Sequence, residues 1–168
     1  MVTIREGAEG LHGAFLGVMD GIIHALSIVS GLQILGDKAI VFVGLSVAGL
    51  ADALANAVGF HVQEESEKFH SQAEVWKGTL LCFLATGLAF MLMAVPILIL
   101  SMEMAVFLDW CISIVLFTVL GLSVDREREF GHRVKRVLEY ITMGTVTALL
   151  CYWIGSMAKA IFEGHQLP

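Results

Sequence analysis

The chain has 168 residues, of which 57% are hydrophobic and 15% are charged. Its mean hydropathy of +0.81 is far above that of a water-soluble globular protein. The formal net charge of −6, and a sequence without a basic segment carrying interleaved aromatic residues, argue against nucleic-acid binding. The composition therefore predicts a membrane protein.

Five apolar stretches have the roughly 20 residues needed to cross hydrocarbon about 30 Å thick. They cover residues 11–35, 39–62, 78–100, 104–124 and 138–158. We expect an all-α integral membrane protein with a single five-helix domain over residues 1–168. Two polar segments are long enough to extend helices into the cytoplasm: the acidic segment 63–77, and residues 125–137, whose mixed charges are typical of a solvated helix.

The distribution of basic residues predicts the orientation, because cytoplasmic loops retain Lys and Arg during insertion. A cytoplasmic N-terminus leaves only Lys38 and Lys159 outside, so we expect the C-terminus on the outer side. The first residues lack the pattern of a cleaved signal peptide, so the first helix should be retained. Cys82, Cys111 and Cys151 lie in different spans without CxxC spacing, which favours packing roles over a disulfide or zinc site.

Two carboxylates lie deep inside predicted spans: Asp20 in the first and Asp52 in the second. An acid near the bilayer centre costs about 2.5 to 3.5 kcal/mol on insertion scales, so it normally faces the bundle interior, a partner or a water-filled path. At a rise of 1.5 Å per residue, Asp20 lies about 14 Å and Asp52 about 16 Å from the cytoplasmic end. The two acids are therefore expected at one level.

Helical periodicity adds His24 one turn after Asp20 and Asn56 one turn after Asp52. Carboxylate, imidazole and amide oxygen together suit Fe, Mn, Co or Zn ions. We expect these four side chains to line a metal site if the two helix faces meet. The alternative is that Asp20 and His24 form a buried, mutually neutralised pair.

Further acids lie at the cytoplasmic mouth. Glu6 and Glu9 precede the first span, and Glu64, Glu67 and His70 belong to the acidic segment. These five side chains could attract a divalent cation. The same pattern is equally typical of a solvated acidic helix.

Two other acids are expected to be structural. Asp109 lies about one turn inside the outer end of the fourth span, where its carboxylate should reach the interface, and Glu139 lies similarly at the inner end of the fifth.

Three strings, GVMDGIIHALSIVSGL, AGLADALANAVGFHVQEESE and YITMGTVTALLCYWIGSMA, resemble the vacuolar iron transporter family, which includes nodulin-like proteins. The strongest element of the resemblance is Asp20-Gly21 followed by Ser30-Gly31-Leu32. It implies a five-helix protomer with a cytoplasmic N-terminus. It also implies a homodimer with its translocation path between the first and second helices of both subunits, and transport of Fe²⁺, Mn²⁺ and related ions out of the cytosol in exchange for protons. The family's helix-one aspartate corresponds to Asp20.

The chain departs from the family pattern at three places. Plant and fungal members carry a Ser-Met pair where this chain has Ala55-Asn56, so the soft thioether ligand is missing. They follow it with Gly-Glu-Tyr, where this chain has Gly59-Phe60-His61. His24 replaces a small residue, and the long cytoplasmic metal-binding domain is reduced to residues 63–77.

These observations favour a transporter of Fe²⁺ and Mn²⁺, and its imidazole and carboxylate ligands would also accept Co²⁺ or Zn²⁺. We expect neither a tightly bound cofactor nor enzyme chemistry. Its partners would be the lipid bilayer, divalent metal ions, protons and a second copy, held two-fold through the Gly-rich face of helix one that includes Gly17. The host membrane would be the plasma membrane in a prokaryote or archaeon, and a vacuolar-type membrane in a eukaryote. Two alternatives remain: a non-transporting metal sensor or assembly module, and a cation or proton channel using the same acids.

Overall fold

The computed structural model describes residues 3–66, 71–124 and 129–164, with side chains from His12 to Glu163 within these ranges. The described residues contain five α-helices, one 3-10 turn and no strand. They are α1 (Thr3–Leu32), η1 (Gln33–Leu35), α2 (Lys38–Ser66), α3 (Gln72–Ile99), α4 (Met102–Ser123) and α5 (Phe130–Gly164). All five α-helices are, by length and composition, long and apolar enough to cross a membrane, as the predicted class of integral membrane protein requires.

Each helix extends beyond the apolar stretch that predicted it, because polar flanking residues continue the helix. α2 runs on to Ser66, and α3 begins after Ser71, whose side chain accepts a hydrogen bond from the backbone of Glu74. The carboxylate of Glu74 in turn accepts a hydrogen bond from the backbone N–H of Ser71, so the two residues form a reciprocal cap that fixes the start of α3. The chain turns at Gly36, directly after η1, with a backbone φ of 72° that glycine adopts readily.

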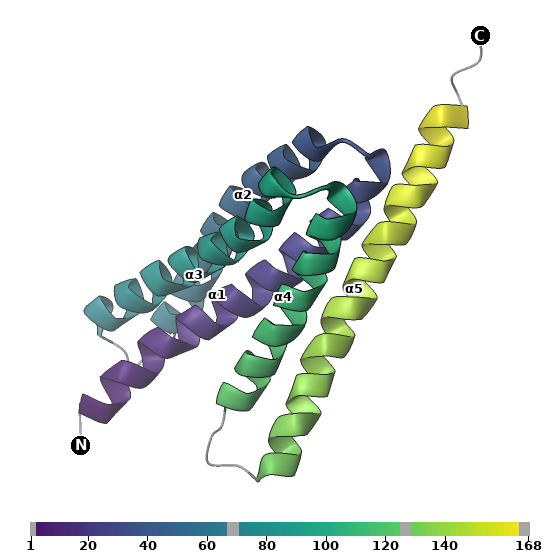
Figure 1. Cartoon of the computed structure of the whole chain (residues 1–168). Coiled ribbons are helices and arrows are strands. Elements are labelled where there is room, and N and C mark those ends of the chain that lie inside the picture. Colours follow the sequence, from purple (N-terminus) through teal and green to yellow (C-terminus); the bar gives the residue numbers. More distant parts are fainter. Residues whose placement is uncertain (1–2, 67–70, 125–128, 165–168) are drawn as a thin grey trace.

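Helix α1 lies at the centre of the bundle, between the α2–α3 pair and the α4–α5 pair (Figure 1). Its most extensive packing is against α3. The largest buried cluster joins α1 residues such as Leu26 and Val29 to Leu45 of α2 and to Met93 and Ile97 of α3. The first residues of α1 and the last residues of α5 lie at opposite ends of the bundle in Figure 1.

The glycine face of α1 packs inside the protomer, against α3. A Cβ on Gly17 would collide with the carbonyl oxygen of Cys82, and one on Gly21 would lie 2.8 Å from the Cβ of Ala89. Small residues let two membrane helices approach this closely. The expectation that this face holds a dimer together is therefore wrong, since α3 of the same chain already covers it.

Three basic side chains bind backbone carbonyls at the C-terminal ends of neighbouring helices. Lys38 donates to the carbonyl oxygen of Leu100 at 2.7 Å, and Lys159 donates to that of Ile34 at 3.0 Å. Arg133 donates through Nε to the carbonyl oxygen of Leu122 at 2.9 Å. Helix C-termini carry partial negative charge, so each contact neutralises a helix end.

Candidate functional site

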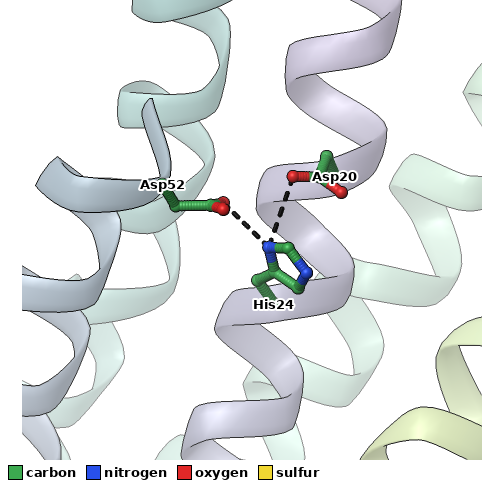
Figure 2. A group of neighbouring side chains, drawn as sticks. All are labelled: Asp20, His24 and Asp52. Carbon is green, nitrogen blue, oxygen red and sulfur yellow. Dashed lines mark ion pairs between the residues drawn. The ribbon is translucent and has the colours of Figure 1, made fainter. Parts of the chain in front are cut away.

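The candidate site lies between α1 and α2, at the level predicted from the depth of the two acids. Asp20 and His24 are one turn apart on α1, and Asp52 reaches toward them from α2 (Figure 2). One ligand atom from each of the three side chains lies within 4.8 Å of the other two. The faces of the two helices therefore meet as the sequence predicted.

His24 bridges the two carboxylates through a single ring nitrogen. Its Nδ1 lies 2.9 Å from Asp52 Oδ2 and 3.3 Å from Asp20 Oδ2. Asp52 Oδ2 is buried and has no partner aligned as a hydrogen bond among the described residues, so its approach to His24 is an ion-pair contact. Both oxygens therefore point at a position that a cation could share.

Asn56 completes the group by holding one of the carboxylates. Its Nδ2 donates a hydrogen bond to Asp20 Oδ2, the same oxygen that faces His24. An amide binds a cation through its oxygen, and that atom is not the one engaged with Asp20. Asn56 thus orients Asp20 and keeps its own oxygen available as a hard ligand.

The site opens to the outside of the protomer on one side. The His24 side chain is 46% exposed, whereas the side chain of Asp52 is 17% exposed. On the neighbouring surface of α2, Ala51, Ala55 and Gly59 are exposed at intervals of one helical turn. Nothing lies within 4 Å of a Cβ placed on Gly59. A partner helix could therefore approach the site here.

Three side chains with carboxylate or imidazole ligands do not fill a metal coordination sphere. Mn²⁺ and related ions take more oxygen and nitrogen ligands than one protomer offers at this position. The remaining ligands would come from Asn56, water or a second copy of the chain. The arrangement suits reversible binding better than permanent retention, because part of it is open.

The residues expected at the cytoplasmic mouth are less well placed. Glu64 is only 7% exposed, so it does not project freely into solvent as a capture ligand would. Glu6 and Glu9 lie on α1, but their side chains are outside the described part. Glu67 and His70 also lie outside the described residues. The capture site stays a prediction.

Asp109 is the residue whose environment the sequence reasoning missed. It was expected to reach the interface, but its side chain is completely buried, and neither carboxylate oxygen has a hydrogen-bond partner among the described residues. The helix begins at Met102, earlier than predicted, which places Asp109 about 10 Å from the helix start. A side chain as short as Asp cannot extend that far to water, and this depth was the available signal.

An apolar groove of about 510 Å³ lies along α2 and α3. Phe42, Leu45, Phe90 and Met91 are among its lining residues. It offers almost no polar atom that could bind an ion, so it is not a second cation site.

Comparison of the chain with models of protein families, with curated proteins and with solved structures gives no match.

Proposed function

We propose that this chain is a membrane transporter that moves divalent transition-metal ions of the Fe²⁺/Mn²⁺ class out of the cytoplasm in exchange for protons. The observation that carries the proposal is the meeting of Asp20, His24 and Asp52 midway along two helices able to span a membrane. Ionisable side chains are expensive at this depth, and those that occur usually mark an ion pathway.

The chemistry of the ligands supports the choice of ion. Carboxylate oxygens and an imidazole bind Mn²⁺, Fe²⁺, Co²⁺ and Zn²⁺, whereas Mg²⁺ and Ca²⁺ prefer oxygen alone. Two carboxylates supply two negative charges, which can offset a dication in a low-dielectric path. His24 Nδ1 must lose its proton before it can bind a metal, so metal and proton compete for the same atom.

The second part of the proposal is a two-fold dimer that faces the site. The small exposed residues Ala51, Ala55 and Gly59 line the surface of α2 next to the half-exposed His24. Small residues at intervals of four favour close helix packing in membranes. A second copy docked here would bring its own carboxylates to the axis and double the ligands available.

Sidedness follows from the basic residues, which favour a cytoplasmic N-terminus. With this orientation, an ion from the cytoplasm would enter along the C-terminal part of α2 and the N-terminal part of α1 to reach Asp20 and Asp52. The resemblance to the vacuolar iron transporter family, carried by Asp20-Gly21 and the glycine-rich second helix, agrees with this direction.

The test is Mn²⁺ flux in proteoliposomes that contain a pH dye. We expect Mn²⁺ to move together with protons in the opposite direction, and Asp20→Asn to abolish the movement. Glu103→Gln is the matched control, because it also replaces a carboxylate by an amide but lies exposed in the first turn of α4. Binding of Mn²⁺ without flux would favour the sensor, and ion conductance without coupling would favour the channel.

A further inference from the structure

The outer half of the bundle contains a carboxylic acid that the metal site does not use. Asp109 is fully buried on the face of α4 that also carries Ala105, Ser113 and Phe117. Both of its carboxylate oxygens lack a partner among the described residues. The hydroxyl of Ser113 is turned away from them, since it donates to the backbone oxygen of Asp109 at 2.8 Å.

No described ionisable side chain on the helices around Asp109 forms a hydrogen bond with its carboxylate oxygens. On α1, Asp20 and His24 are engaged with each other and with Asp52. On α3, the apolar part beyond Lys77 carries one ionisable group, Cys82, which packs against Gly17.

The same holds for the remaining neighbours of α4. On α5, Cys151 packs against Gly31, and Tyr140 packs near Phe117 and Leu120. Lys38 of α2 donates to the carbonyl oxygens of Leu98 and Leu100. Among the residues that the structure describes, Asp109 therefore has neither a counter-ion nor a hydrogen-bond donor.

A buried carboxylate without a partner is far less favourable than a buried neutral acid. Asp109 should therefore carry its proton in the conformation described. A buried neutral acid without a hydrogen-bond partner does not stabilise the fold more than an apolar residue of similar size would. A packing role therefore does not explain Asp109. Acids at membrane depth are most often part of an ion or proton pathway.

We propose that Asp109 is a proton-binding site separate from the metal site, and that it carries the proton which moves against the metal ion. The inference rests on the transport function proposed above. Asp109 lies about 10 Å from the start of α4, and with the N-terminus inside that end faces the outer side. The proton would come from water on the outer side, and the acid would release it to water when the bundle opens toward the cytoplasm, leaving a carboxylate.

The experiment compares Mn²⁺ and proton movement in proteoliposomes for the wild type and for Asp109→Asn. The amide has the shape of the protonated acid and cannot release a proton. We expect Asp109→Asn to bind Mn²⁺ as the wild type does and to let Mn²⁺ follow its own gradient. Its proton movement should fall to the level of protein-free vesicles. Asp109→Glu should restore proton movement, and Ser113→Ala, on the same buried face, should leave it unchanged.

Infrared difference spectroscopy provides a readout that does not depend on transport. Addition of Mn²⁺ to the wild type should remove a carboxylic-acid C=O band, which should be absent from Asp109→Asn and shifted in Asp109→Glu. Unchanged proton movement in Asp109→Asn would overturn the proposal, and so would a band that is the same in all three proteins. A wild type that moves no Mn²⁺ but shows the Asp109 band would instead refute the transport function alone.

Discussion

His24 of α1 and Asp52 of α2 meet at 2.9 Å between Nδ1 and Oδ2, and this contact joins the two helices at the candidate site. Asp20 faces the same nitrogen at 3.3 Å. One imidazole nitrogen thus occupies the position between two carboxylates where a metal ion would be bound by both. In the metal-free protein the imidazole can hold the two acids together, and a metal ion would take over that role.

Loss of either carboxylate should abolish metal movement while the protein stays folded. We expect Asp20→Asn and Asp52→Asn each to weaken Mn²⁺ binding at least about tenfold, because a neutral amide cannot offset the charge of a dication in a low-dielectric site. Mn²⁺ binding to the purified variants, measured by calorimetry, checks this. If Asp52→Asn binds like the wild type, the metal position lies on α1 alone.

Metal affinity should rise with pH, because ligation requires a deprotonated imidazole at His24. The ordinary pKa of histidine is about 6.5. For each proton that the metal displaces, the apparent metal affinity rises by about tenfold per pH unit while that group is protonated. His24→Ala should flatten this part of the profile. Titrations of Mn²⁺ between mildly acidic and mildly basic pH, on both proteins, make the measurement. Parallel profiles would show that His24 does not bind the ion.

The balance between ions should depend on Asn56 and His24. Asn56→Met replaces a hard oxygen by a soft sulfur and removes the hydrogen bond to Asp20, so it should raise transport of Fe²⁺ relative to Mn²⁺. His24→Ala should lower the transport of Fe²⁺, Co²⁺ and Zn²⁺ more than that of Mn²⁺. Competition fluxes with the four ions test both. Ratios that stay constant in both variants would mean that only carboxylates contact the ion.

Two glycines offer a matched pair that separates folding from assembly. Gly17→Ala places a Cβ against the backbone of Cys82, so it should destabilise the protomer by about 1 to 3 kcal/mol. Gly59→Leu enters open space and should leave thermal stability unchanged while weakening the proposed dimer. Melting temperature and detergent-solubilised mass report the two effects. A full-strength dimer in Gly59→Leu would exclude this surface of α2 as the interface.

The positions of the four clustered residues followed from the sequence, because helical rise and periodicity are enough to place Asp20, His24, Asp52 and Asn56 at one depth. The partner of the glycine face of α1 did not follow, since a stripe of small residues looks the same whether it packs within a protomer or between two. The burial of Asp109 was also missed. Asp109 lies on the face of α4 that packs into the bundle with Ala105, Ser113 and Phe117, and a stretch that is apolar all round does not show which face is turned inward.

The lysines at one end of the bundle have a consequence for an ion that leaves there. Lys38 and Lys159 direct their ammonium groups at the carbonyl oxygens of Leu100 and Ile34, and Lys159 also lies 3.7 Å from Glu163. Their positive charge is therefore compensated locally by helix ends and a carboxylate. A departing dication at this end would meet little electrostatic repulsion from Lys38 and Lys159, and these two lysines would not slow its release.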